Sequence, residues 1–204
     1  VTLSKPLQKQ LWQTIIKNKI ENQNEVLNIF GKFDKLKQLK NKVLSGDAGN
    51  SEAKASLIYF KELFGKSFKR RDENFINACL NYGYAIVRGF IARSIVVHGL
   101  LPYIALFHTN QYNAFNLADD IIEIFRPVVD LLVKSKFENF YELSSQVKAL
   151  LFGIINYNVL IDGQKQTVSN AIEMVVESYV KSLKESKNLL KQVYICGLSE
   201  HKYE

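Results

Sequence analysis

One histidine and a group of acidic residues could together bind a metal ion. His108 lies in a polar segment, and Asp119, Asp120 and Glu123 follow it at the start of a helical pattern. Carboxylate oxygens bind Mg²⁺ and Mn²⁺, and Mn²⁺ also accepts imidazole. If the histidine loop and the acidic helix meet beside apolar walls, these side chains predict a divalent-metal site. The alternative is a solvated acidic helix start that only balances the helix dipole.

Two helices have to bring these side chains together. The first spans residues 72–98 and is nearly uncharged, and its Gly83 and Gly89 suggest close packing because glycine costs a helix about 1 kcal/mol. Gly99 and Pro102 end it. The second helix has core positions at helical spacing, namely Leu117, Ile121, Phe125, Val128 and Leu132. We therefore expect an all-α fold, a single helical domain built around the helix at residues 72–98.

The other segments surround these two helices. Apolar periodicity predicts further helices at residues 4–30, 33–44, 51–64, 138–151 and 168–187. Loose alternation before an Asp-Gly pair predicts a short β-hairpin within residues 153–166. We divide the chain into N-terminal basic helices (1–48), a helical core that holds the candidate metal site (49–188) and a C-terminal tail (189–204) without an assigned structure.

Positive charge is concentrated at the start of the chain. The 204 residues carry 27 Lys and Arg against 20 Asp and Glu, a net charge of +7. Residues 1–44 hold nine lysines and three acids, which gives 9 − 3 = +6. Such a surface attracts polyanions, although surface lysines can also serve only solubility. The candidate nucleic-acid contacts are Lys35, Lys37, Lys40, Lys42 and the connector residues Lys69, Arg70 and Arg71.

The composition excludes several classes of protein. An apolar content of 47% with 23% charged residues is ordinary for a globular protein and excludes the disordered classes. Only two cysteines occur, without a CxxC partner, so we expect a reducing compartment and no thiolate metal site. The longest uncharged run, residues 94–118, is broken by Gly99 and Pro102 and does not predict a membrane span. With no signal peptide in residues 1–20, we expect a cytoplasmic protein.

Several stretches occur in an order that is found in a known family. They are EAKASLIYF from Glu52, Asn77, LNYGY from Leu80, His108, and DIIEIFRPVVD from Asp120. This order resembles the CRISPR-associated spacer integrase and endonuclease family, above all the C-terminal helical domain of its type II members. The separations of 56 residues from Glu52 to His108 and of 15 from His108 to Glu123 fit that branch.

The resemblance implies a catalytic metal site. In such enzymes a glutamate, a histidine and a second acid bind Mg²⁺ or Mn²⁺, and the matching residues here are Glu52, His108 and Glu123. The metal would assist attack by a 3′-hydroxyl, so that a short DNA spacer is inserted into the repeat array by transesterification. Asp119 and Asp120 could support the ligands or hold a second metal, and Asp120 is the better candidate because it lies one turn from Glu123.

The resemblance also implies partners. These are DNA, as spacer fragment and CRISPR repeat, and the small ferredoxin-like CRISPR-associated protein of the integration complex, with a homodimer in the full-length form and no membrane. Two departures from the family stand out. Ala53 replaces the glycine that usually follows the first catalytic glutamate, and the family's N-terminal β-rich domain has no counterpart before Val1. We therefore expect a helical-domain fragment, which could be inactive without that domain.

Two other functions remain open from the residues alone. A non-catalytic DNA- or RNA-binding domain would use the lysine-rich helices, with Glu52 and Glu123 as surface charges. An oligomerisation domain would use apolar helical faces and no metal. Dependence on a divalent metal distinguishes the enzyme from both of these domains. Salt-dependent DNA binding distinguishes the nucleic-acid-binding domain from the oligomerisation domain.

Overall fold

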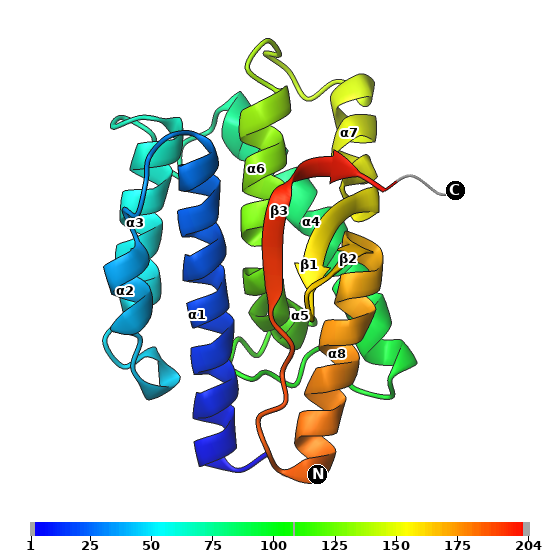
Figure 1. Ribbon diagram of the computed structural model, residues 1–204. Helices are drawn as coiled ribbons and strands as arrows, with labels where there is room; N and C mark the ends of the chain where they lie inside the picture. Colours follow the sequence, from blue (N-terminus) through cyan, green and yellow to red (C-terminus); the bar gives the residue numbers. More distant parts are fainter. Residues whose placement is uncertain (1–2, 108, 202–204) are drawn as a thin grey trace.

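Helices make up most of the fold (Figure 1). The structure is a computed structural model that describes residues 3–107 and 109–201. Its α-helices are α1 (Lys5–Ile29), α2 (Lys37–Asn41), α3 (Ser51–Phe64), α4 (Phe75–Val97), α5 (Asn116–Ile121), α6 (Arg126–Lys136), α7 (Ser145–Phe152) and α8 (Val168–Glu185). Short 3₁₀ turns are η1 (Ser45–Asp47), η2 (Ile122–Ile124) and η3 (Gly153–Asn156), and the strands are β1 (Tyr157–Ile161), β2 (Gln164–Thr167) and β3 (Val193–Glu200). The expected helical class is confirmed.

Helix α1 occupies the middle of the molecule. It packs against α2 and α3 on one side and against α6 and β3 on the other (Figure 1). An apolar stripe at i, i+4 spacing drives this packing, and it consists of the buried residues Leu7, Leu11, Ile15, Ile16, Ile20 and Leu27. Trp12, which the pattern places at the edge of this stripe, is only 1% exposed and belongs to the core.

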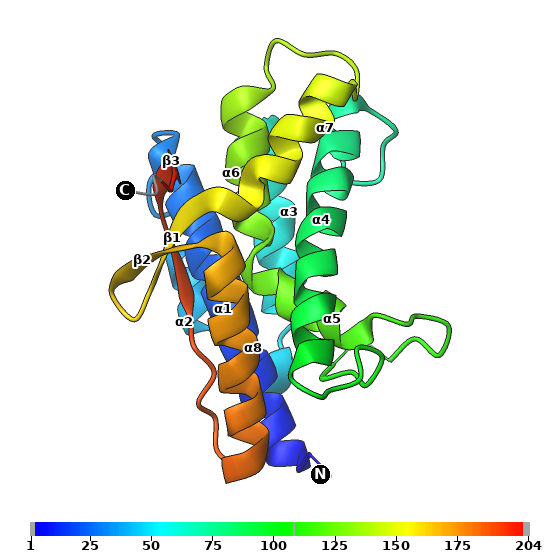
Figure 2. The same ribbon diagram turned by 90° about the vertical axis from the view of Figure 1, so that its right-hand side faces the viewer.

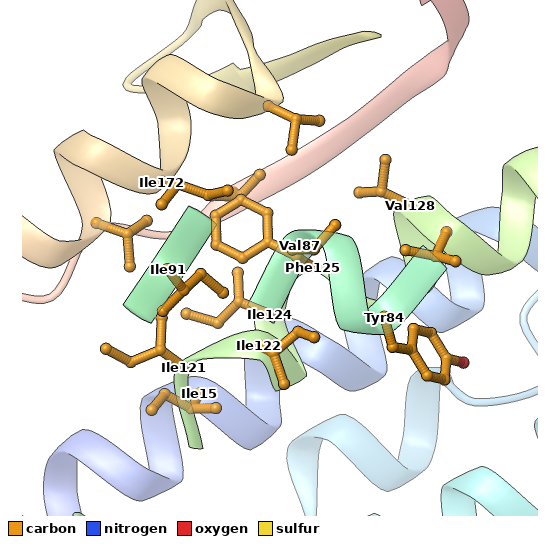
Figure 3. Packing of buried hydrophobic residues seen from close by; sticks show 14 of the residues in the cluster. Ile15, Tyr84, Val87, Ile91, Ile121, Ile122, Ile124, Phe125, Val128 and Ile172 are labelled. Atoms are coloured by element: carbon orange, nitrogen blue, oxygen red, sulfur yellow. The ribbon is translucent and has the colours of Figure 1, made fainter. Parts of the chain in front are cut away.

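The segment around η2 forms the centre of the hydrophobic core. Its side chains Ile121, Ile122, Ile124 and Phe125 are each no more than 1% exposed. Figure 3 shows them enclosed by residues of three helices, with Ile15 from α1, Val87 and Ile91 from α4, and Ile172 from α8. The long helix α4 forms one wall of this core, with α7 and α5 beside it (Figure 2).

The second helix of the sequence prediction is broken in two. Instead of one helix through residues 117–132, α5 ends at Ile121, η2 follows, and α6 begins at Arg126. Pro127 explains the new start, because proline lacks an N–H donor and is tolerated only in the first turn of a helix. Glu123 therefore lies in a tight 3₁₀ turn and not in the first turns of a helix.

Helix α3 (Ser51–Phe64) has the predicted bounds, whereas other predicted helix boundaries differ. The first turn of α3 is held by Asp47, whose two carboxylate oxygens accept the backbone N–H groups of Ser51 and Glu52 at 2.8 and 3.0 Å. Helix α4 begins after Asn74, whose side chain accepts from the Asn77 N–H. The helix predicted at residues 138–151 is only Ser145–Phe152, and that predicted at residues 33–44 is only Lys37–Asn41.

The predicted hairpin is confirmed and acquires a third strand. Strands β1 and β2 are antiparallel, and Asp162 and Gly163 connect them at φ values of 51° and 75°. Two residues at positive φ are typical of a type I′ hairpin turn. The tail, which had no assigned structure, forms β3 and pairs with the other side of β1, so the strand order is β2-β1-β3.

Two asparagines on α1 fix β3 to the helix. Asn18 donates to the Val193 carbonyl at 2.8 Å and accepts its N–H at 3.0 Å. Asn22 donates to the same carbonyl at 2.8 Å and accepts the Ile195 N–H at 3.2 Å. These side chains satisfy backbone groups on the open edge of the sheet. The division of the chain at residues 48 and 188 stays a prediction; in space, α1 and β3 both pack on elements of the middle part.

Among the helices of the described residues, none has the length and hydrophobicity needed to cross a membrane.

Of the two glycines in α4, one is required by packing. A Cβ on Gly83 would lie 2.6 Å from the Cγ1 of Val129 in α6, whereas a Cβ on Gly89 would meet no atom within 4 Å. The proposed packing role of Gly89 is therefore wrong, and that of Gly83 is supported.

We expect Gly83→Ala to destabilise the fold by about 1–3 kcal/mol through overpacking. Gly89→Ala should stabilise it by up to about 1 kcal/mol, because alanine favours the helix. Urea unfolding followed by circular dichroism measures both variants. Equal free energies of unfolding for the two would contradict the close contact between α4 and α6.

Candidate active site

The carboxylates of Glu52 and Glu123 meet at one buried ammonium group. Glu52 lies in the first turn of α3, Glu123 in η2, and Lys19 in the middle of α1. The Lys19 Nζ lies 2.6 Å from Glu52 Oε1 and also contacts Glu123 Oε2. The side chains of Lys19 and Glu123 are 6% and 7% exposed, and that of Glu52 is 28% exposed. Two acids from separate segments thus converge on a single positive charge.

The charge of Lys19 depends on these two acids. Burial by itself lowers the pKa of the ammonium, but the negative charges of Glu123 and Glu52 outweigh it, so the pKa of Lys19 is above its ordinary value. Arg126, at the start of α6, places its Nε 2.8 Å from Glu123 Oε1. Its guanidinium also lies over the Tyr84 ring, 4.6 Å from the centroid, which fixes its direction. Glu123 therefore lies between two cations.

Two cavities border the acidic pair. One of about 250 Å³ is lined by Lys19, Gln23, Glu52, Ser56, Phe60, Arg70, Tyr84, Glu123, Arg126 and Asp130. The other, of about 450 Å³, is lined by Thr109, Asn110, Asn113, Asn116, Asp119, Glu123 and Arg126. Glu123 and Arg126 line both cavities, whereas Glu52 lines only the smaller one, so Glu123 is reachable from two sides.

The predicted ligand His108 lies outside the described residues, but the residues next to it are well positioned. Asp120 Oδ2 accepts the backbone N–H groups of Leu106 and Phe107, each at 2.7 Å. The Phe107 ring stacks on Trp12 of α1 at a centroid distance of 4.3 Å. On the other side of position 108, Thr109 lines the same cavity as Glu123. Leu106 and Phe107 are thus held by Asp120 and Trp12, and Thr109 shares a cavity wall with Glu123.

The two other candidate acids have different surroundings. Asp120 is fully buried and holds the backbone of the preceding loop. Asp119 lines the larger cavity, where it accepts from Asn113 at 2.7 Å and lies 3.6 Å from Arg88. Among the residues with described positions, no three His, Cys, Asp or Glu side chains form a metal-ligand group. The roles of Glu52, His108 and Glu123 as ligands, and of Asp119 and Asp120 as their supports, remain predictions.

Lys19 is the site residue that the sequence analysis missed. It was counted among the nine lysines of a solvated basic surface. Its position carried a signal, because it follows Ile15 and Ile16 by three or four residues and precedes Ile20, and so belongs to the apolar stripe. A lysine on a buried stripe requires a partner of opposite charge, and here there are two.

Comparison with known proteins identifies the family. The family model described as CRISPR associated protein Cas1 matches residues 2–141. The whole chain is also 40% identical to the CRISPR-associated endonuclease Cas1 of Neisseria meningitidis, of which it covers 69%. The chain therefore belongs to the Cas1 family. The family resemblance inferred from Glu52, His108 and the segment after Asp120 is confirmed.

Solved structures agree with a Cas1 fold. A casposase bound to integration product superposes with a TM-score of 0.75 at 20% identity, over 90% of this chain and 66% of that one. A Cas6-RT-Cas1–Cas2 complex gives a TM-score of 0.72 at 16% identity, over 93% of this chain and 25% of that one. At these identities the comparison shows the shared fold.

The candidate basic residues have three kinds of surroundings. Lys35, Lys42, Lys69 and Arg71 are exposed, and Lys37 and Lys40 form ion pairs with Asp34 and Glu21. Arg70 is different, since it lines the smaller cavity beside Glu52 and contacts the side chains of Asn77 and Asn81. Their binding of nucleic acid remains a prediction.

A buried acid supports the wall of the smaller cavity. Asp130 of α6 is 1% exposed and accepts a hydrogen bond from the Tyr84 hydroxyl. Burial raises the pKa of Asp130 from 3.8 to about 6, against the opposing effect of the Tyr84 and Tyr59 hydroxyls. Between these two pH values the folded protein holds a proton that the unfolded chain releases. The stability that this proton supplies is therefore present at low pH and lost as the pH rises through about 6.

We expect Asp130→Asn to remove this loss, since an amide does not titrate. A raised pKa of about two units corresponds to roughly 3 kcal/mol. The difference in free energy of unfolding, wild type minus variant, should therefore decrease by roughly 3 kcal/mol from pH 4 to pH 7. Urea titrations of both proteins at the two pH values measure it. A constant difference between the proteins would show that Asp130 ionises normally.

Proposed function

We propose that this chain is the helical catalytic part of a metal-dependent DNA integrase and endonuclease of CRISPR adaptation. The observation that carries the proposal is the meeting of Glu52 and Glu123 at one buried cation. Such a pair of carboxylates supplies the oxygen ligands that Mg²⁺ and Mn²⁺ require, around a point where a positive charge is already stabilised. The residues therefore fit a divalent metal, with His108 proposed as the third ligand.

The chemistry that a bound Mg²⁺ or Mn²⁺ supplies is polarisation of the scissile phosphodiester and activation of a 3′-hydroxyl or water. The chain's own residues would hold and orient the reactants. Arg126 fixes one oxygen of Glu123, and the other contacts Lys19, which also contacts Glu52. Arg70, on the wall of the same cavity, presents a guanidinium suited to a DNA phosphate.

The reaction we propose is insertion of a short DNA spacer into a repeat array by attack of its 3′-hydroxyl on a repeat phosphodiester. The relationship to Cas1 endonucleases and the fold shared with a casposase bound to integration product support it. A Cas2-like protein, small and ferredoxin-like, is the proposed partner, because the shared fold also occurs in a complex that contains Cas1 and Cas2. We propose a homodimer for the full-length form.

Strand transfer on branched DNA tests this function. With Mn²⁺ present, we expect the activity to be lost by at least about a hundredfold in Glu52→Gln and Glu123→Gln, because each variant removes a charged ligand. Glu138→Gln is the matched control, since Glu138 also pairs with a lysine, Lys134, but lies on the surface.

The assay should be run with this chain and with a version extended by the β-rich domain of the family. Activity that persists in EDTA, or in both glutamine variants, would contradict the proposed chemistry. DNA binding without any metal-dependent reaction in either version would favour the alternative, a non-catalytic binding domain.

The basic residues around α2 should contribute to DNA affinity. Replacing Lys35, Lys37, Lys40 and Lys42 by glutamine removes four charges and should flatten the dependence of log K on log salt, by about 0.9 for each phosphate that is no longer neutralised. Lys37 and Lys40 already pair with acids, so the loss should be smaller than for four free lysines.

The matched control replaces four exposed lysines on or beside α8, which lies on the other side of α1 (Figure 1), namely Lys165, Lys181, Lys184 and Lys187. Fluorescence anisotropy with a labelled duplex at several salt concentrations gives both slopes. Equal slopes for the two sets would mean that α2 contributes only general charge.

A further inference from the structure

Lys19 lies where a metal ligated by Glu52 and Glu123 would have to lie. Its ammonium is within contact distance of both carboxylates, and its side chain is 6% exposed. Charged groups at such positions are stabilised by their partners and not by water. The position of Lys19 therefore affects whether a metal cation can reach the two carboxylates. An inference from this position rests on the proposed function and its metal site.

The charges around the acidic pair are already balanced. Glu52 and Glu123 contribute two negative charges, and Lys19 and Arg126 contribute two positive ones. A divalent cation added to this group would leave an excess of two positive charges in a largely buried place. Metal binding is therefore favourable only if one internal cation moves away or if an anion, such as a DNA phosphate, arrives with the metal.

The cavity beside the pair offers Lys19 another position. Gln23, one helical turn after Lys19, lines the same cavity and is 1% exposed. Its Oε1 is buried and has no hydrogen-bond partner among the described residues. An acceptor that lacks a donor is costly, and an ammonium released from the carboxylates would satisfy it. Ser56 provides a second oxygen on the cavity wall.

We propose that the Lys19 ammonium and a divalent cation occupy the space between Glu52 and Glu123 in alternation. Without metal, Lys19 keeps the two carboxylates together. When a metal binds, Lys19 leaves them for the cavity side of α1, where it is available to a DNA phosphate. Lys19 is thus a positioning residue that assembles the ligands in advance and lowers metal affinity until DNA is present.

Mn²⁺ affinity without DNA tests the alternation. In the alternation a metal must displace the ammonium from two carboxylates, and losing two such charge contacts reduces the apparent affinity at least about tenfold even at the dielectric constant of water. We therefore expect Lys19→Met to bind Mn²⁺ at least about tenfold more tightly than the wild type, as measured by electron paramagnetic resonance of free Mn²⁺. Lys134→Met, which removes a surface lysine paired with Glu138, should leave the affinity unchanged.

A second measurement uses the wild-type chain and does not depend on the folding of a variant. With ¹⁵N-labelled lysine, the ammonium resonance of buried Lys19 should shift as Mg²⁺ is added, while that of Lys134 should not. Lys19→Arg assigns the resonance. In the presence of EDTA, Lys19→Met should also melt at a lower temperature than the wild type, and Mn²⁺ should reduce the difference.

The outcomes separate the alternation from the proposed function. If wild type and Lys19→Met bind Mn²⁺ equally, or the Lys19 resonance is unchanged at saturating Mg²⁺, the alternation is wrong although the metal site stands. If neither protein binds Mn²⁺, or Glu123→Gln binds it as well as the wild type, the metal site and the alternation both fail.

Discussion

The ion cluster of Lys19, Glu52 and Glu123 is the constraint on which the arrangement of the site depends. It joins α1, the start of α3 and the turn η2, three segments that are distant in the sequence. Removing one member of a buried ion pair typically costs about 3–5 kcal/mol, because the remaining charge stays without compensation. The hydrophobic core supplies the stability around the cluster, since η2 is enclosed by apolar side chains of α1, α4 and α8 (Figure 3). The cluster itself determines which way the two carboxylates point.

Helix α1 carries most of the contacts that position the site. Gln8 donates to the Leu106 carbonyl and Trp12 stacks on the Phe107 ring. Lys19 contacts both acids, and Asn18 and Asn22 bind the backbone of β3. These polar side chains alternate with the apolar stripe over four turns of one helix. The sequence analysis treated this region as a basic surface and chose α4 as the organising element. In the structure α4 packs against α5, α6, α7 and α8, and α1 supplies Lys19 to the acidic pair and contacts the loop before position 108.

The sequence allowed prediction of whatever depends on periodicity or on local turn chemistry. The amphipathic helices α1, α3, α4 and α8 and the Asp-Gly hairpin were of this kind. It did not predict features that depend on distant contacts. Strand β3 exists because β1 and two asparagines of α1 satisfy its backbone, and nothing in the pattern of residues 189–204 records that. The break at Phe125 was predictable from Pro127 and was overlooked because the apolar spacing runs through it.

The capping of α3 explains why Glu52 is free to reach the site. A glutamate in the first turn of a helix would ordinarily interact with the exposed N–H groups there. In the structure Asp47 already accepts the N–H groups of Ser51 and Glu52. The Glu52 carboxylate is then directed across to Lys19 and Glu123. Asp120, three residues before Glu123, has a similar role, because its carboxylate accepts the backbone N–H groups of Leu106 and Phe107. In both places one acid accepts backbone N–H groups, and a second acid three to five residues later pairs with Lys19.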